Sequence, residues 1–323
     1  MMQSFKEHAL TFESFLQEQE LFSRKPENLY EPCAYILSIG GKRIRPSVCL
    51  MAADMFGTVT KDALWAAATV ELFHNFTLIH DDIMDQAPLR RGQVTVHEKY
   101  GTTAGILSGD VMNIMAYQCL EHVQAPFLLP LLSLFNQTAI EVCEGQQLDM
   151  DFEQKELVSE AAYIHMIGHK TAVLLACSMK IGAIVSGVNE TDAALLYTFG
   201  KNLGIAFQLQ DDYLDTFGNP ALVGKQIGGD ILANKKTFLA ITALQNADTH
   251  QRTALQALAQ GHSPTKVSDT ISLFNALDVA ASCKRAIQTY TDKANEALAA
   301  INIAPEQKVA FEELVAFLIT RDY

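Results

Sequence analysis

The sequence predicts an all-α protein that folds as a single helical domain over residues 1-323. Apolar residues recur at spacings of three and four along nearly the whole chain, which is the period of an amphipathic helix. No stretch alternates strictly between apolar and polar residues for long enough to propose a sheet, and no Pro/Ser-rich linker divides the chain. With 49% apolar and 19% charged residues, the chain has enough material for one large core.

Glycine and proline interrupt the helical spacing at three places. These are Gly40-Gly41 before a basic run, the turn from Gln86 to Gly92, and the stretch from Gly218 to Gly229. Between the interruptions, the expected helices cover 3–22, 28–40, 44–56, 60–85, 101–122, 127–150, 156–187, 190–217, 234–247, 250–261, 266–302 and 305–320.

The charge and cysteine content narrow the possible partners and compartments. A net charge of -13 argues against nucleic acid and anionic membranes, because both need a basic surface. The N-terminus lacks the pattern of an export signal, and no apolar run is long and unbroken enough to expect a membrane span. Six cysteines lie far apart without a CxxC pair, which predicts buried free thiols in a reducing compartment. We therefore expect a cytoplasmic protein.

Two aspartate-rich motifs repeat the pattern DDxxD, as DDIMD at 81–85 and DDYLD at 211–215. Both end long apolar helices, although aspartate is a poor helix former and its charge is unfavourable at a helix C-terminus. The outer aspartates of each motif share one helix face, whereas the middle aspartate is rotated by roughly 100°. One such motif fits a solvated acidic patch, but two close together would repel unless cations bridged them. Because Mg²⁺ suits carboxylate and phosphate oxygens, the pair predicts a metal-diphosphate site.

Two basic clusters provide candidate anion sites. The run GGKRIRP at 40–46 places two glycines and three cations at the start of a helix, which is suited to cradling a diphosphate. The run LRRG at 89–92 places adjacent arginines directly after the first aspartate motif. Either cluster alone also fits a solvated basic turn. However, five of only 24 Lys and Arg residues fall in these two clusters, which favours a binding role.

The remaining candidates interrupt apolar helices or flank the second aspartate motif: His74, Lys170, Thr171, Gln208, Lys225 and Lys235. Polar groups in apolar helices need partners. His74 precedes Asp81 by about two helical turns and can share its face, although a hydrogen-bonded core histidine explains it equally well. Gln208 lies one turn before Asp211. Individually, each of these residues is ordinary.

Taken in this order, GGKRIRP, DDIMD with LRRG, KT, FQLQDDYLD and GKQIGGDI resemble the trans-prenyltransferase (polyprenyl synthetase) family over about residues 40 to 240. The resemblance implies a short-chain trans-isoprenyl diphosphate synthase. Such an enzyme joins isopentenyl diphosphate to an allylic diphosphate, here dimethylallyl, geranyl or farnesyl diphosphate. It also implies a homodimer and the isoprenoid synthase fold, a bundle of about a dozen helices around a deep central cavity. The implied cofactor is Mg²⁺, with about three ions per active site.

The resemblance also assigns roles to individual residues of this chain. The metal ligands would be Asp81, Asp85 and Asp211. Further catalytic roles would fall to Asp82, Asp212, Asp215, Lys170 and Gln208. Isopentenyl diphosphate would be bound by Lys42, Arg45, His74 and Arg91. The allylic diphosphate would be bound by Arg90, Lys170, Thr171, Gln208, Lys225 and Lys235.

Product length depends on the residues just before the first motif. Phe76 and Phe73 lie about 7.5 Å and 12 Å down the helix axis from Asp81, where aromatic rings could floor the substrate pocket. The alternative is that both rings are ordinary core residues. Thr77, together with a first motif that has no insertion, resembles C20 (geranylgeranyl) producers more than bacterial C15 (farnesyl) producers. We expect C20, and C15 stays open.

Two other functions compete with this interpretation. A terpene cyclase would share the helical cavity and the first DDxxD, but the second DDxxD and GGKRIRP oppose it. A non-catalytic partner subunit of the same fold would be expected to lack some of the charged motif residues, and all of them are present.

Overall fold

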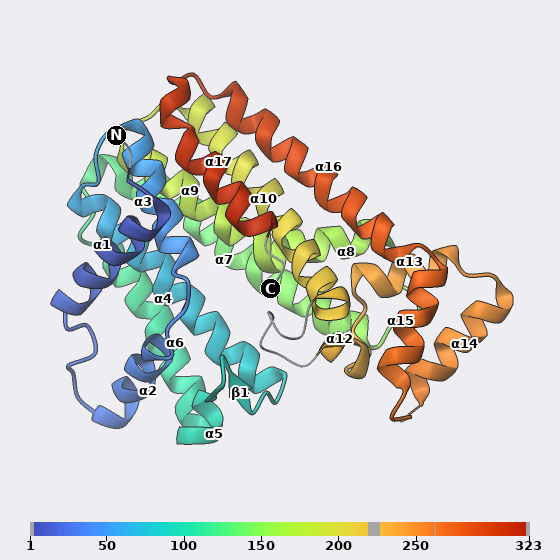
Figure 1. The fold of residues 1–323 in the computed structure, drawn as a ribbon. Coiled ribbons are helices and arrows are strands. Elements are labelled where there is room, and N and C mark those ends of the chain that lie inside the picture. Colours follow the sequence, from blue (N-terminus) through green and yellow to red (C-terminus); the bar gives the residue numbers. More distant parts are fainter. Residues whose placement is uncertain (1–2, 219–226, 262, 321–323) are drawn as a thin grey trace. The chain divides into compact units, whose positions relative to one another are not determined.

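The computed structural model describes residues 3–218, 227–261 and 263–320 (Figure 1). Within these residues the regular structure is helical apart from one two-stranded hairpin, which confirms the prediction of an all-α protein. The chain divides into two compact units. Unit 1 comprises Met1–Phe135, Cys177–Ala194 and Ile303–Ala310, and unit 2 comprises Asn136–Ala176, Leu195–Asn302 and Phe311–Tyr323. The expectation of a single domain stays a prediction.

Unit 1 is built around one long central helix. Its elements are α1 (Phe5–Glu18), α2 (Glu27–Ser38), α3 (Ile44–Phe56), α4 (Lys61–Met84), β1 (Leu89–Arg90), β2 (Gln93–Val94), α5 (Val96–Tyr100) and α6 (Thr102–Leu120). Thr60 caps α4 by accepting a hydrogen bond from the Ala63 amide. The helix packs mainly against α6, α3 and α1, and residues 66–73 are buried on every side. This packing fixes the first DDxxD motif at its C-terminal end.

The hairpin after α4 presents the adjacent arginines. Leu89 pairs with Val94 and Arg90 with Gln93, so only Arg91 and Gly92 form the turn. Both have positive φ angles, 53° and 75°, as a tight two-residue hairpin requires. Arginine rarely adopts this conformation, and such exceptions concentrate at functional sites.

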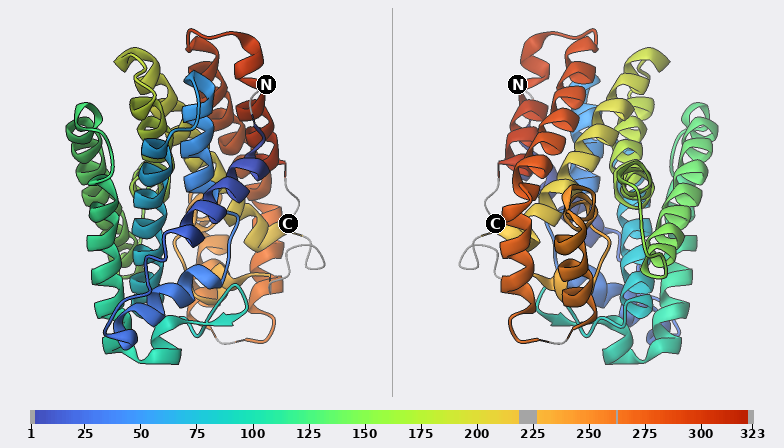
Figure 2. Two further views of the ribbon diagram at one scale, coloured as in Figure 1. Left: turned by 90° about the vertical axis from the view of Figure 1, so that its left-hand side faces the viewer. Right: turned by 90° about the vertical axis from the view of Figure 1, so that its right-hand side faces the viewer.

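Unit 2 contains most of the later helices. Four helices contain residues of both units: α7 (Ala125–Glu153), α9 (Val173–Val185), α10 (Glu190–Phe217) and α17 (Val309–Ile319). The other elements are α8 (Glu160–Ile167), α12 (Gly229–Leu232), α13 (Phe238–Asn246), α14 (Thr249–Gln260), α15 (Lys266–Ala276), α16 (Val279–Ala300) and a 3₁₀ turn at Pro305–Gln307, which belongs to unit 1. The short helices α12 to α15 gather near the start of α16 (Figures 1 and 2).

Two of the expected long helices are each divided in the structure. The helix expected at 156–187 contains a π-helical turn at Gly168–Ala172 between α8 and α9. The helix expected at 266–302 is divided into α15 and α16, because Asp278 adopts a left-handed conformation with φ 56°. Aspartate tolerates this conformation better than most residues, and the helical spacing of apolar residues continues across the break. The helix expected at 44–56 matches α3.

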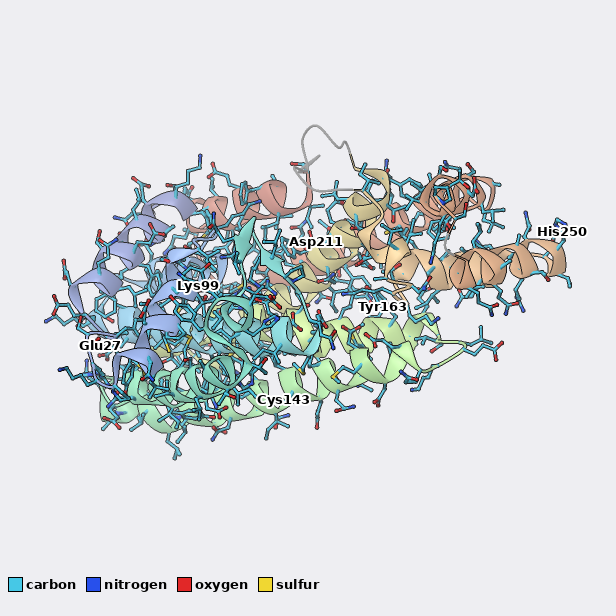
Figure 3. All side chains as sticks on the ribbon, turned by 90° about the horizontal axis from the view of Figure 1, so that it is seen from below. Glu27, Lys99, Cys143, Tyr163, Asp211 and His250 are labelled. Atoms are coloured by element: carbon cyan, nitrogen blue, oxygen red, sulfur yellow. The ribbon has the colours of Figure 1, made fainter. Side chains whose placement is uncertain are left out.

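The structure tests two expectations about the compartment, the burial of the cysteines and the lack of a membrane span. All six cysteines are free thiols and five are buried, but Cys143 is exposed on α7 (Figure 3), so the expectation of burial is wrong for this residue. Two stretches, Ala125–Glu153 and Glu160–Val185, are long and apolar enough to cross a membrane by length and composition alone. The second is mostly buried inside the protein, as a core helix is.

Candidate active site

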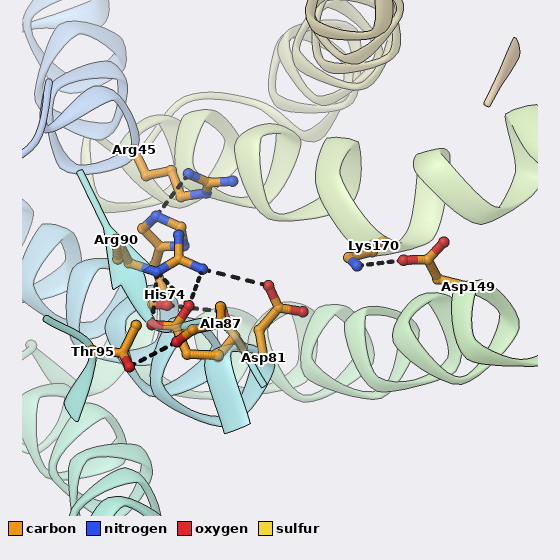
Figure 4. Close-up of polar contacts among 10 residues, drawn as sticks. Arg45, His74, Asp81, Ala87, Arg90, Thr95, Asp149 and Lys170 are labelled. Atoms are coloured by element: carbon orange, nitrogen blue, oxygen red, sulfur yellow. Dashed lines mark hydrogen bonds and ion pairs between the residues drawn. The ribbon is translucent and has the colours of Figure 1, made fainter. Parts of the chain in front are cut away.

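A basic cluster in unit 1 joins residues of α3, α4 and the hairpin. The Arg45 Nη1 atom lies 3.1 Å from the His74 Nε2 atom (Figure 4). The Arg91 guanidinium covers Gly41, where an added Cβ atom would lie 2.5 Å from Arg91 Nη1. Gly41 also has a φ of 147°, a conformation that other residues rarely adopt, which explains why glycine stands at position 41. Lys42 follows it and is exposed. The structure thus brings together Arg45, His74 and Arg91, three of the four residues predicted to bind isopentenyl diphosphate.

Burial, together with the positive charges of this cluster, keeps His74 neutral. Burial, followed by the nearby Arg45 and Arg91 guanidinium groups, lowers the pKa of His74 well below its ordinary value. Burial also lowers the pKa of Arg45 to about 10, an effect that Glu71 opposes. Because arginine has only donors, His74 Nε2 must accept the Arg45 hydrogen bond, which places the imidazole proton on Nδ1. The cluster therefore has an excess of positive charge, as a diphosphate site needs.

Arg43 and Glu71 hold the basic run in place, a role that the sequence analysis missed. Arg43 adopts a left-handed conformation (φ 48°) and donates from Nη1 to Glu71 Oε1 at 2.7 Å and from Nη2 to the Leu37 carbonyl at 2.7 Å. Glu71 is 3% exposed and also accepts from Asn75 Nδ2 at 3.0 Å. A glutamate inside the apolar stretch 66–73 was the signal that could have predicted this pair.

The middle aspartate of the first motif is a protein anchor. Asp82 is 1% exposed, and the Arg90 Nε atom donates to its two carboxylate oxygens at 2.9 and 2.8 Å (Figure 4). Arg90 Nη2 also lies 3.6 Å from Asp81 Oδ2. Asp85 is exposed and forms the C-cap of α4. The contact with Asp82 fixes the hairpin against α4, and the role of Arg90 in binding the allylic diphosphate stays a prediction.

The middle aspartate of the second motif is an anchor as well. Asp212 is 2% exposed and accepts hydrogen bonds from the Tyr163 hydroxyl, from Gln208 Nε2 at 3.1 Å and from the Phe238 amide at 3.4 Å. Burial is the main cause that raises the pKa of Asp212 to about 7. Asp212 therefore ties α10 to α8 and to the start of α13.

Carboxylates crowd together around the end of α10 in unit 2. The Asp230 amide donates to Asp215 Oδ2 at 3.0 Å. Burial, followed by the charge of Asp215, raises the pKa of Asp230 to about 6, and Asp149 and Asp211 act in the same direction. Sequence analysis missed Asp149 and Asp230. The run GGD at 228–230, at the start of α12, was the available signal for Asp230.

This crowding tests whether the site suits Mg²⁺. A divalent cation would offset the carboxylate charges that raise the pKa of Asp230, and hard oxygen ligands are those that Mg²⁺ prefers. Among the described residues, no group of three or more His, Cys, Asp or Glu side chains is arranged to hold a metal by itself. Mg²⁺ commonly binds through one or two carboxylates together with substrate phosphate oxygens. The donor set fits that mode of binding.

A pocket of about 100 Å³ in unit 2 collects most of the residues predicted for the allylic diphosphate. Lys170 donates from Nζ to Asp149 Oδ2 at 2.6 Å (Figure 4), and Thr171 donates from Oγ1 to Gln208 Oε1 at 3.3 Å. These three predicted residues, Lys170, Thr171 and Gln208, line the pocket together with Lys235. The π-helical turn presents Lys170 and Thr171, and such turns are frequent at functional sites. Lys225 lies outside the described residues.

The candidate chain-length residues occupy two environments. Phe73 is 1% exposed and packs against Phe135, with ring centroids 5.2 Å apart. Phe76 is half-buried, 5.5 Å from the Phe73 ring and 4.8 Å from the His80 ring. Thr77 donates its hydroxyl to the His74 carbonyl at 2.8 Å. Phe73 therefore fits a core role, and Phe76 is the better candidate to contact a substrate.

The fold and these clusters define a class of protein: an all-helical protein that combines two DDxxD motifs with clusters of basic residues. The chain belongs to the Polyprenyl synthetase family, whose model matches residues 26–277. It is 36% identical to a geranylgeranyl diphosphate synthase of Methanosarcina mazei over 93% of this chain and 91% of that protein.

Solved structures agree with the family assignment. A crystal structure of a geranylgeranyl pyrophosphate synthase matches with a TM-score of 0.94 and 43% identity, covering 99% of both chains. A geranylgeranyl pyrophosphate synthetase of Pyrococcus horikoshii matches with a TM-score of 0.92 and 32% identity, covering 98% of this chain and 97% of that one.

Proposed function

We propose that this protein is a short-chain trans-prenyl diphosphate synthase whose main product is geranylgeranyl diphosphate. The observation that carries the proposal is the basic cluster of Arg45, neutral His74 and Arg91 in a chain that resembles geranylgeranyl diphosphate synthases over nearly its full length. A terpene cyclase does not need this second diphosphate site, and a non-catalytic subunit would not be expected to keep it.

The chain's own residues perform most of the binding. Arg45 and Arg91, with Lys42, hold the diphosphate of isopentenyl diphosphate, and His74 orients Arg45. Lys170, Thr171, Gln208 and Lys235 surround the diphosphate of the allylic substrate. Asp81 and Asp85 of unit 1 and Asp211 of unit 2 would be the ligands for Mg²⁺, which when bound would supply positive charge to stabilise a departing diphosphate. An apolar pocket then protects the allylic cation from water until the double bond of isopentenyl diphosphate attacks it.

Product length follows from the residues that close the substrate pocket. Phe76 is the ring that limits chain growth, and the small Thr77 leaves room for a C20 chain. Dimethylallyl, geranyl and farnesyl diphosphates should all serve as primers, because each is an intermediate length on the way to C20. A C15 product is the alternative.

A homodimer is part of the proposal. On α6, the apolar side chains Ile106, Leu107 and Ile114 are 43%, 54% and 66% exposed. Contiguous exposed apolar side chains on one helix are typical of an interface between subunits. An Ile114→Glu variant should shift the mass measured by light scattering from two chains toward one, and an unchanged mass would exclude this face.

The catalytic proposal has a direct test. Purified protein is incubated with Mg²⁺, labelled isopentenyl diphosphate and, in turn, the C5, C10 and C15 allylic diphosphates. A discrete C20 product from each primer is expected. A C15 end product would correct the proposed product length alone, whereas a folded protein that condenses none of the primers would contradict the proposed function.

We infer a cytoplasmic location from the free thiols, because cysteines stay reduced in that compartment.

A further inference from the structure

Unit 2 contains a second cavity, of about 420 Å³, that the proposed reaction does not use. Most of its lining residues belong to α12, α13, α14 and α15 or to the segment between α12 and α13; Figure 1 labels these helices. This volume falls in the range of pockets that hold small-molecule ligands. The cavity shares one segment with the smaller pocket described above, because both are lined by Asp230, Lys235, Lys236 and Thr237.

A buried lysine marks one part of this cavity. Lys266 is 6% exposed and donates from Nζ to Asn234 Oδ1 at 2.8 Å and to the Ala259 carbonyl at 3.1 Å. All three residues line the cavity. No carboxylate in the described part of the chain forms an ion pair with Lys266. Two neutral acceptors leave the ammonium charge without a counter-charge, and one of its three N–H donors remains for a ligand.

The rest of the lining combines apolar surface with further positive charge. Apolar side chains come from five segments of unit 2: Leu157, Ile231, Ala240, Leu244, Leu255 and Phe274. Lys235 and Lys236 add two ammonium groups, against the carboxylates of Glu156 and Asp230. The lining therefore has three lysines and two acids, with apolar side chains around them. This composition suits a ligand with an anionic head and an apolar tail.

We propose that this cavity binds a small amphipathic anion, a linear alkyl or prenyl chain with a phosphate or carboxylate head, and that Lys266 contacts the head. The segment 230–237 is common to both cavities, so a ligand here acts on the residues that surround the allylic diphosphate. Thr237 caps α13 by accepting from the amide of Ala240, which also lines the cavity. Occupancy should therefore change the KM for the allylic substrate.

Binding is measured by isothermal titration with decyl phosphate, decanoate and neutral decanol, in buffer with EDTA so that metal-dependent diphosphate binding is absent. Two variants address the cavity: Lys266→Met removes the charge, and Ala259→Trp fills the cavity from an exposed position that should not disturb folding. Lys293→Met, which changes an exposed lysine of α16, is the matched control. Each anion should bind the control with the same affinity as the wild type. Both cavity variants should lower that affinity by about tenfold or more.

Three results would overturn the proposal. Equal affinity in the wild type and in Ala259→Trp would place the ligand elsewhere, even if Lys266→Met fails to fold. Decanol binding as tightly as the anions would exclude recognition of the charge. With Mg²⁺ and substrates present, decyl phosphate should alter the allylic KM of the wild type and not of Ala259→Trp; the same change in both would exclude the link to the neighbouring pocket. The first two results are binding measurements that do not depend on turnover, so they stand apart from the proposed activity, whereas the third also requires it.

Discussion

Replacing Glu71 with glutamine should destabilise unit 1 strongly. The Glu71 and Arg43 side chains are 4% and 8% exposed, and their atoms lie 2.7 Å apart. Glutamine preserves the shape of the acceptor but removes its charge, which leaves the buried Arg43 guanidinium beside other cations. Its remaining acidic neighbour, Glu13, is 3.5 Å away and half-exposed. Removing one partner of such a buried pair costs about 3–5 kcal/mol in free energy of unfolding.

The single tryptophan provides the assay. Trp65 lies on α4, the helix that carries Glu71, and its ring stacks on His122 with centroids 3.9 Å apart. Its fluorescence during urea denaturation therefore reports the unfolding of unit 1. Glu18→Gln, at the exposed end of α1, is the control and should change stability by no more than about 0.5 kcal/mol. If Glu71→Gln lowers the free energy of unfolding by as little as this control does, the ion pair between Arg43 and Glu71 does not stabilise unit 1.

Four further outcomes are expected. Asp81→Ala and Asp211→Ala should each abolish turnover while circular dichroism stays unchanged; full activity in both would remove the metal assignment. Burial lowers the pKa of His8 below its ordinary value of 6.5, so the folded state resists protonation. The protein's free energy of unfolding should therefore be largest above about pH 6.5 and should fall as the pH decreases. His8→Asn should flatten that dependence. Tyr163→Phe leaves a buried carboxylate short of a donor, which should cost about 1–3 kcal/mol and speed hydrogen exchange at the start of α13. Phe76→Ala should lengthen the products resolved by chromatography, and an unchanged distribution would make that ring an ordinary core residue.

The spacing of apolar residues predicted most helices, because the buried residues of a helix recur with the helical period of 3.6 residues. The extent of α3 was predicted, since its apolar residues stop where Gly57 begins the next turn. The break at Asp278 and the π-helical turn at Gly168–Ala172 were not, because apolar spacing continues across both. Hydrophobic periodicity records which face is buried. It does not record a local change in backbone hydrogen bonding, which depends on contacts made only in the folded chain.

The candidate site was predicted by residue type, whereas the partners of those residues were not. The cations of GGKRIRP were identified as a group, yet Arg43 binds Glu71 while Arg45 contacts His74. One residue separates the two arginines in sequence, and the left-handed conformation of Arg43 separates their directions. Likewise, Asp230 lies in the acid cluster because the turn at Gly228 returns the chain to Asp215. Such pairings depend on tertiary geometry that a linear motif does not contain.

The middle aspartates explain why the motif is DDxxD and not simply DxxxD. The outer positions share one helix face, and the middle position points roughly 100° away, into the protein. In unit 1 the middle aspartate binds Arg90 and so fixes the hairpin that presents Arg91. In unit 2 it binds the amide at the start of α13, directly after the segment that carries Lys235. Each motif thus combines two functions on one helical turn. Its outer carboxylates are those that we propose as cation ligands, and its middle carboxylate positions the basic segment that follows the helix in the chain.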